Sequence, residues 1–227
     1  NRPALLPLLI ILLAGFFLRL SSLTREGLWL DEGITAYLSS LPVSEIIENR
    51  ASDVHPPLYF VFLRGWVSLF GSSEAALRFP SLLAGVAAIA LLFLLARKLF
   101  SPAAGLFASL LLAFSPLHLY FSEEARSYAM ALALGLAAFY FALKTLESSK
   151  IRHALLYGGF QALALYFHFS GFFFAVSANL YFLFLWRFRF SAPFFKPWLY
   201  AQGFSVLLFL PWLSVLLSQV QKVKSGF

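Results

Sequence analysis

Residues 80–96, PSLLAGVAAIALLFLLA, form a continuous apolar run without a charged side chain. A helix needs about 20 predominantly apolar residues to cross the hydrocarbon core of a bilayer, and this run approaches that length. Similar runs recur along the chain. The first is read as a span rather than a signal peptide, because no small-residue cleavage site follows it. The sequence therefore predicts seven membrane spans, at about 4–21, 80–96, 103–120, 127–144, 153–168, 171–186 and 198–217.

The composition leads to the same class of protein. Of the 227 residues, 61% are hydrophobic and 12% are charged, whereas a soluble domain has about a quarter of its residues charged. The net charge of +7 does not indicate nucleic-acid binding, because the basic residues stand between the apolar runs, where they set topology and meet lipid headgroups. The absence of cysteine excludes disulfides and cysteine-based sites. We predict an all-α polytopic membrane protein.

The loop of residues 22–79, between the first two spans, carries much of the polar chemistry. Within it, residues 57–70 form an apolar stretch of 14 residues. As a helix this stretch would reach only about 21 Å, short of the ~30 Å hydrocarbon core. Residues 34–41 place their apolar side chains on one helical face, as in helices that lie on a membrane. We expect two interfacial helices in an external loop, within a single membrane module covering residues 1–227.

The distribution of charge indicates an orientation. With the N-terminus inside, the inner loops hold the basic residues, as the positive-inside rule requires; these are Arg97, Lys98, Lys144, Lys150, Arg152, Arg187, Arg189 and Lys196. Of the ten acidic residues, only Glu147 then lies inside. A crossing at residues 57–70 would reverse every later loop and break the rule. We therefore expect loop 22–79 on the extracytoplasmic face of the cytoplasmic membrane.

This orientation collects the charged motifs on one face. They are Asp31-Glu32, Asp53 and His55 before Pro56-Pro57, Glu74 with Arg78, Glu123 to Tyr128, and His168 in a tight turn. A carboxylate near the interface can accept a proton from an attacking hydroxyl. Arginines can neutralise a phosphate leaving group, and an apolar groove between helices can hold an isoprenoid tail. Together these groups could move a sugar from a lipid phosphate to an acceptor hydroxyl.

Each of these residues also has a structural interpretation. Asp31 is a preferred N-cap residue for a helix that begins near Glu32. Arg78 and Arg126 could be interface anchors that extend toward headgroups, and His55 before two prolines could be a turn residue. The functional interpretation therefore depends on the co-location of these residues and not on any one of them.

Three segments in series resemble a known family. They are LWLDEGITAYLSS (28–40), HPPLYFVFLRGWVSLFGSSEAALRFPSLLAGV (55–86) and SPLHLYFSEEARSYAM (115–130). In order and spacing they resemble bacterial glycosyltransferase family 39-type proteins, relatives of the protein O-mannosyltransferases and the lipid A aminoarabinose transferase, with the GT-C fold. The resemblance extends from residue 1 to about 185. It implies a GT-C module with about seven transmembrane helices, belonging to an inverting enzyme that uses a polyprenyl-phosphate sugar and is longer than this chain.

The resemblance also assigns roles to residues. Asp31 resembles the family's catalytic base in the first external loop, and Glu32 its acidic neighbour, so both are predicted to be catalytic. Arg78 and Arg126 match positions expected to meet the donor phosphate or to order the pocket. The full set predicted at the donor phosphate or around the pocket is Arg78, Arg126, His55, Glu124, Tyr128 and His168, of which the last two follow from their position on the same face.

We predict an inverting glycosyltransferase that moves a hexosyl or pentosyl group from a polyprenyl-phosphate donor to a hydroxyl or an amine-bearing acceptor, which is a protein, lipid or glycan. One alternative is a transporter or lipid flippase, but that would place ionisable residues near the bilayer midplane, where the spans are almost uncharged. A non-catalytic scaffold subunit is the other. No cofactor is predicted. Carboxylates with His55 or His168 could ligate a divalent metal, although no helix-borne ligand spacing points to one.

Overall fold

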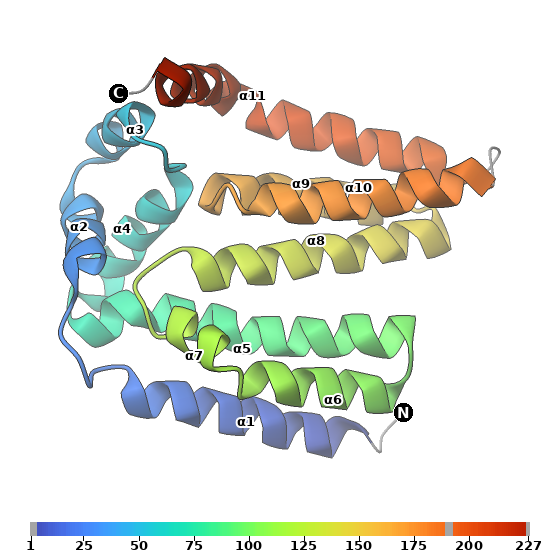
Figure 1. Ribbon diagram of the computed structural model, residues 1–227, viewed down its shortest axis with the longest axis horizontal. Helices are drawn as coiled ribbons and strands as arrows, with labels where there is room; N and C mark the ends of the chain where they lie inside the picture. Colours follow the sequence, from blue (N-terminus) through green and yellow to red (C-terminus); the bar gives the residue numbers. More distant parts are fainter. Residues whose placement is uncertain (1–3, 189–192, 226–227) are drawn as a thin grey trace.

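A computed structural model describes residues 4–188 and 193–225, and these residues form helices and turns without a strand. Figure 1 shows long helices lying side by side, with a group of shorter helices across one end. The helices are α1 (Leu5–Ser22), α2 (Leu30–Ser40), α3 (Val43–Ser52), α4 (Leu58–Phe70), α5 (Glu74–Leu99), α6 (Pro102–Ala113), α7 (Pro116–Ser122), α8 (Tyr128–Ser148), α9 (Ile151–Phe167), α10 (Gly171–Phe188) and α11 (Phe195–Ser225). The all-α class predicted from the sequence is confirmed.

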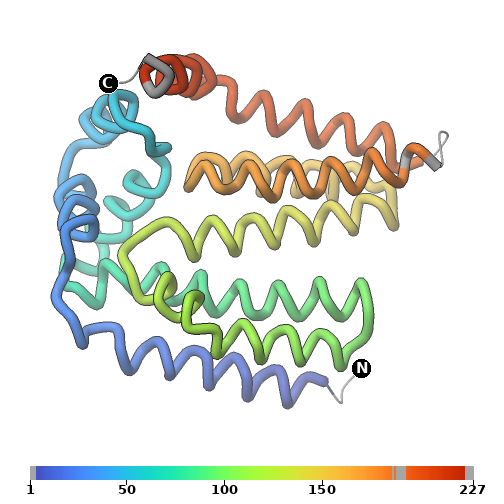
Figure 2. Tube along the Cα trace, viewed as in Figure 1, coloured from blue at the N-terminus to red at the C-terminus, as the bar shows by residue number. Residues whose placement is uncertain are grey.

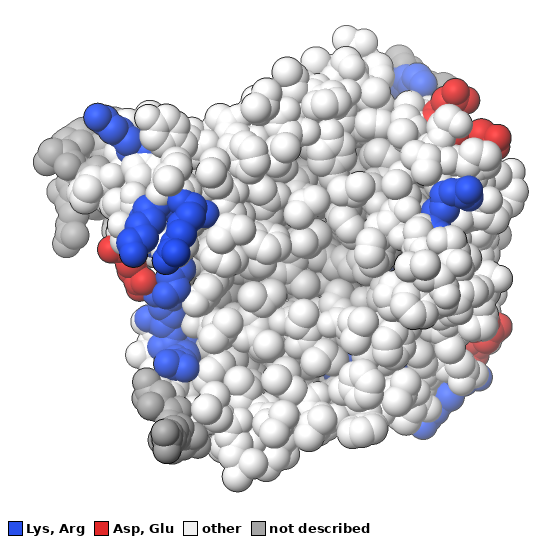
Figure 3. Space-filling view, turned by 180° about the vertical axis from the view of Figure 1, so that it is seen from behind, with Lys and Arg blue, Asp and Glu red and all other residues white. Residues whose placement is uncertain are grey.

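Several of the long helices are suited to a bilayer. Among the described residues, α1, α5, α8 and α11 are long and apolar enough to cross a membrane. Figure 3 shows the corresponding surface, a broad face with almost no charge and a row of Lys and Arg side chains along one edge. The protein is therefore a multi-pass membrane protein. The predicted crossings at 153–168 and 171–186 correspond to α9 and α10 and stay predictions, since α9 with its 17 residues reaches only about 26 Å.

The predicted span at 103–120 corresponds to two helices, α6 and α7, rather than to one continuous helix. Helix α6 ends at Ala113, and α7 continues at an angle of 64° to it. The reason lies in the dipeptide Ser115-Pro116, because proline has no N–H to donate and disfavours a helical conformation in the residue before it. The Ser115 hydroxyl accepts from the N–H of His118 and so caps the new helix. If the bent pair is one span, five helices of the described part are candidates.

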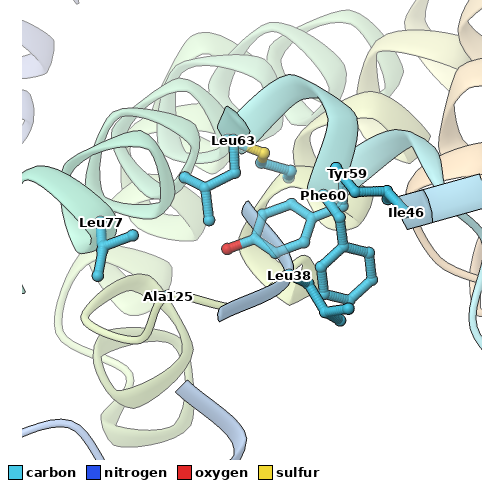
Figure 4. Packing of buried hydrophobic residues seen from close by; sticks show 8 residues of the cluster. Leu38, Ile46, Tyr59, Phe60, Leu63, Leu77 and Ala125 are labelled. Carbon is cyan, nitrogen blue, oxygen red and sulfur yellow. The ribbon is translucent and has the colours of Figure 1, made fainter. Parts of the chain in front are cut away.

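The short helices α2, α3 and α4 form a cap over one end of the bundle. Only a short turn separates the end of α2 at Ser40 from the start of α3 at Val43. Gly71, with φ of 82°, ends α4 in a backbone conformation that favours glycine. The apolar sides of these three helices share one core with the starts of α5 and α8 and the loop before α8. It is built from Leu38, Ile46, Tyr59, Phe60, Leu63, Leu77, Ala125 and Met130 (Figure 4). Burial of each large apolar side chain contributes about 1.5–3 kcal/mol, so the cap is held firmly on the bundle.

The last helix also reaches the cap. The trace in Figure 2 shows α11 running back along the bundle until its final turns lie against α3. There the buried Gln219 side chain donates from Nε2 to the backbone carbonyl of Arg50 at 2.9 Å and to that of Asp53. The loop between α3 and α4 is therefore fixed from two sides, by the core residues of the helices that flank it and by α11.

Candidate active site

A buried ion pair between Glu32 and Arg78 lies at the junction of the cap and the bundle. Arg78 donates from Nε to Glu32 Oε1 at 2.8 Å and from Nη2 to Oε2 at 2.7 Å. The Glu32 carboxylate also accepts from the backbone N–H groups of Ala125 at 2.8 Å and Trp29 at 3.4 Å. Burial raises the pKa of Glu32, but the Arg78 and backbone hydrogen bonds outweigh it, so the pKa lies below its usual range. Glu32 is an ionised group whose lone pairs are already used.

Arg78 uses its remaining donors on the loop between α1 and α2. Its Nη1 donates to the carbonyls of Leu23 and Glu26, both at 2.8 Å, and its Nη2 donates to the carbonyl of Gly27 at 3.1 Å. With the two bonds to Glu32, all five guanidinium N–H groups have a protein acceptor. This arrangement favours the second of the two expected roles of Arg78, ordering the pocket, over direct contact with a donor phosphate.

Asp31 differs from Glu32 in being accessible. Its side chain is 36% exposed. Its partner is Arg126, whose Nη2 lies 3.4 Å from Asp31 Oδ2 and whose Nη1 is 3.5 Å from the Asp31 carbonyl. Arg126 also lies over the Tyr128 ring, 5.6 Å from its centroid. These contacts are long compared with those of Arg78, so both Asp31 and Arg126 keep hydrogen-bonding capacity for a ligand.

A second group, from the loop between α3 and α4, lies near Arg126. Asp53 Oδ2 accepts from Arg50 Nη1 at 2.6 Å and is 3.2 Å from His55 Nδ1. Burial raises the pKa of Asp53, but the Val54 N–H and the Arg50 charge prevail and hold it below the usual range. Arg50 was not singled out from the sequence. The three-residue spacing to Asp53 on one helix end was the signal for it.

His168 joins this group from the turn after α9. Its ring lies 5.1 Å from the Tyr128 ring and 6.5 Å from the His55 ring, centroid to centroid. Its Nδ1 accepts from the backbone N–H of Ser170 at 3.1 Å. Burial, with the nearby charges of His55 and Arg126, lowers the pKa of His168 to about 4, so this imidazole is neutral at pH 7.

A pocket of about 560 Å³ opens beside the Glu32–Arg78 pair. It is lined by Ser22, Arg25, Glu26, Gly27, Trp29, Glu32, Arg78, Tyr120, Glu123 and Glu124. Burial raises the pKa of the Glu124 carboxyl, and the Glu32 charge adds to this. Arg25 in the α1–α2 loop and Tyr120 in α7 were not predicted from the sequence, because a single exposed cation or aromatic residue carries no distinguishing pattern.

The predicted residues therefore form two neighbouring groups. Glu32, Arg78 and Glu124 border the pocket, while the others lie on the Arg126 side; these are Asp31, His55, Arg126, Tyr128 and His168. A narrow crevice lined by His55, Tyr59 and Arg126 continues from the second group. Asp31 stands where the groups meet, since it lies in the chain between the pocket residues Trp29 and Glu32 and pairs with Arg126. Within the described residues, no three His, Asp or Glu side chains gather closely enough to hold a metal ion.

A further set of buried polar contacts, made by Arg19, lies next to the site within the bundle. Arg19, fully buried in α1, donates to the carbonyls of Gly15 at 2.8 Å and Ala113 at 3.2 Å, and its Nη2 lies 2.8 Å from His118 Nδ1. The Ala113 carbonyl is the last of α6, so Arg19 satisfies the backbone where the helix breaks. Arg19 thereby holds α7 in the position from which the loop of residues 123–127 enters the site.

These features define a class, a multi-pass all-α membrane protein with a pocket of acidic and arginine side chains at one end of its bundle. Residues 54–215 match the model of the dolichyl-phosphate-mannose-protein mannosyltransferase family, and because this is more than two thirds of the chain, the protein belongs to that family. It is thus a mannosyltransferase-like glycosyltransferase at the family level. Neither the curated proteins nor the solved structures contain a match. The matched segment includes His55, Arg78 and Arg126, while Asp31 precedes it.

Proposed function

We propose that this protein transfers a sugar from a polyprenyl-phosphate donor to an acceptor hydroxyl, with inversion at the anomeric carbon, on the extracytoplasmic face of the cytoplasmic membrane. The family membership supports the glycosyltransferase class. The observation that carries the finer proposal is the contrast between two adjacent acids: Glu32 is enclosed by four hydrogen-bond donors, whereas Asp31 is partly exposed beside Arg126.

In this proposal Asp31 is the general base. The acceptor O–H donates its proton to the Asp31 carboxylate as the oxygen attacks the anomeric carbon from the face opposite the phosphate. The bond between that carbon and the phosphate oxygen breaks, and the leaving polyprenyl phosphate keeps the electron pair. A base must be within hydrogen-bond reach of the proton that it accepts, and the partly exposed carboxylate of Asp31 satisfies this better than the enclosed one of Glu32.

Arg126 is proposed to stabilise the leaving phosphate. Its guanidinium has long contacts of 3.4 to 3.5 Å that leave it hydrogen-bonding capacity, and a guanidinium can bind phosphate oxygens bidentately. Arg50 adds positive charge nearby while paired with Asp53. Arg78 and Glu32 act as positioning residues, because they join the α1–α2 loop, α2 and the loop before α8 into one unit.

The test measures release of free polyprenyl phosphate by the full protein in liposomes that contain polyprenyl-phosphate sugars and acceptor. Loss of a general base typically lowers the reaction rate by a factor of about 10²–10⁴. Asp31→Asn should therefore lower the rate of polyprenyl phosphate release by about 100-fold or more. Glu45→Gln is the matched control, since Glu45 is an exposed acid in the same external loop. Equal turnover in wild type and Asp31→Asn would remove Asp31 from the chemistry.

A wild-type protein that binds the donor lipid yet releases nothing, with acceptor present, would contradict the transferase proposal as a whole. That outcome would favour a lipid carrier or a non-catalytic subunit. A glycosylated product with retained anomeric configuration would leave the transferase class intact and overturn the inverting mechanism.

A further inference from the structure

A second pocket lies at the other end of the bundle, between the last turns of α5 and α8. It has a volume of about 380 Å³ and is lined by Leu94, Arg97, Lys98, Tyr140 and Lys144. All five side chains are half-buried. We call this site the α5–α8 basic pocket. It shares no residue with the candidate active site.

The α5–α8 basic pocket carries positive charge that the protein does not neutralise. Lys98 forms an ion pair with Glu147. Among the described residues, Arg97 and Lys144 have no such acidic partner; the Arg97 guanidinium lies over the Phe93 ring and the Lys144 ammonium over the Tyr140 ring, 5.9 and 5.7 Å from the ring centroids. Two like charges held in one concavity repel each other, so an anion bound between them would be stabilised.

The distance along α5 places this pocket at the surface of a bilayer. Arg97 follows Arg78 by 19 residues in one helix, which corresponds to about 28 Å at 1.5 Å per residue. The hydrocarbon core of a membrane is about 30 Å thick. When Arg78 lies at one interface, Arg97 and Lys144 therefore lie at the level of the headgroups on the opposite side. Both helices are candidate membrane spans.

We propose that the α5–α8 basic pocket binds the phosphate headgroup of an anionic phospholipid. Arg97 and Lys144 contact the phosphate, the Tyr140 hydroxyl donates to it, and Leu94, one turn deeper in α5, contacts the start of an acyl chain. A lipid fits better than a free phosphate because the site is at the bilayer edge and has an apolar floor. This binding is independent of the proposed transferase activity.

Ordinary interfacial anchoring predicts a different pattern. Figure 3 shows that Lys and Arg side chains are spread along this whole edge of the molecule. Lys150, in the turn after α8, and Arg152, at the start of α9, are exposed and do not line the pocket. If diffuse surface charge were responsible for lipid binding, removing these two charges would weaken it as much as removing Arg97 and Lys144.

The experiment compares three forms of the full protein in a neutral detergent by native mass spectrometry, titrated with short-chain phosphatidylglycerol. We expect one saturable lipid per chain in the wild type and in Lys150→Gln/Arg152→Gln, and at least tenfold weaker binding in Arg97→Gln/Lys144→Gln. Each basic group near an anionic headgroup contributes about 1 kcal/mol of binding free energy, so the loss of two lowers the affinity by roughly 30-fold. A thermal melt of each form confirms folding without lipid.

Three results would overturn the proposal. Equal weakening in both double variants would assign the binding to diffuse charge. Equal affinity for phosphatidylcholine would show that the headgroup's net charge is not recognised. Displacement of the lipid by millimolar inorganic phosphate, with equal affinity for both, would identify the ligand as a free anion rather than a lipid.

Discussion

Glu32 and Arg78 are joined by two hydrogen bonds of 2.8 and 2.7 Å, and neither side chain is more than 6% exposed. The pair links α2 to α5, and through the Ala125 N–H it also holds the loop before α8. A bidentate buried pair of this kind is costly to desolvate and costly to break. Its place at the junction of three chain segments indicates that it sets the geometry of the pocket.

Breaking this pair should destabilise the protein more than a surface change does. In Glu32→Gln the Arg78 charge stays buried without a counter-charge, and the expected loss is about 3–5 kcal/mol. The measurement is the fraction of folded protein after heating in detergent, followed by size-exclusion chromatography. Glu48→Gln, an exposed acid on α3, is the control. A Glu32→Gln protein as heat-resistant as the control would contradict the structural role.

A change at Arg126 should affect activity much more than stability. Its contacts with Asp31 and Tyr128 are 3.4 to 3.5 Å long, so Arg126→Gln should cost under about 1 kcal/mol of stability. If its guanidinium meets the donor phosphate, the same change should lower transferase activity by 10²-fold or more. Activity and heat resistance are measured on the same preparation. Arg126→Gln with full activity would remove it from the donor site.

His168 should make stability depend on pH. Its pKa in the folded protein is lowered to about 4 from the usual 6.5, so above pH 6.5 the imidazole is neutral in both states and has no effect. As the pH falls below 6.5 the unfolded chain binds the proton first, and stability decreases until about pH 4. His168→Asn should reduce the loss of melting temperature between pH 7 and pH 5. An unchanged slope would contradict this assignment.

The sequence predicted the all-α membrane class because long uncharged apolar runs are typical of membrane-spanning helices. It also predicted which charged motifs share one end of the molecule. It did not predict which of the two adjacent acids is enclosed and which is accessible. Asp31 and Glu32 follow one another in a helix, and only the positions of Arg78 and Ala125 determine which one is enclosed. Arg19 and Gln219 were also missed, since the contacts that give them a role in the fold are with residues 94 or more positions away in the chain.

The packing of α7 against α5 depends on a close approach at Gly85. A Cβ added at this position would collide with the Ser122 side chain and lie 3.2 Å from Arg19 Nε. Gly85→Ala should therefore push α7 away from α5 and destabilise the protein by about 1–3 kcal/mol. Gly65→Ala in α4 is the control, because nothing lies within 4 Å of its added Cβ and alanine favours a helix. Equal melting temperatures would show that α7 tolerates the shift.

The contact of Gln219 with the α3–α4 loop leads to a prediction about activity. Its Nε2 donates to the carbonyls of Arg50 and Asp53, and Arg50 in turn binds the Asp53 carboxylate that faces His55. In Gln219→Ala the buried carbonyl of Arg50 and the partly buried carbonyl of Asp53 lose this donor, which costs about 1–3 kcal/mol and frees this loop to move. Because Asp31 and Arg126 are not touched, we expect a higher KM for the donor with a smaller change in kcat.

Ser218→Ala is the matched control, since Ser218 is the adjacent residue and its hydroxyl donates only to the Val215 carbonyl of its own helix. Gln219→Glu separates packing from hydrogen bonding, because it keeps the side-chain size but has no N–H to donate and places a negative charge against two carbonyls. We expect it to raise KM at least as much as Gln219→Ala does. If both changes at position 219 left KM equal to that of Ser218→Ala, then α11 would not position the α3–α4 loop, and the Arg50–Asp53–His55 group would have to be ordered by the core of the cap alone.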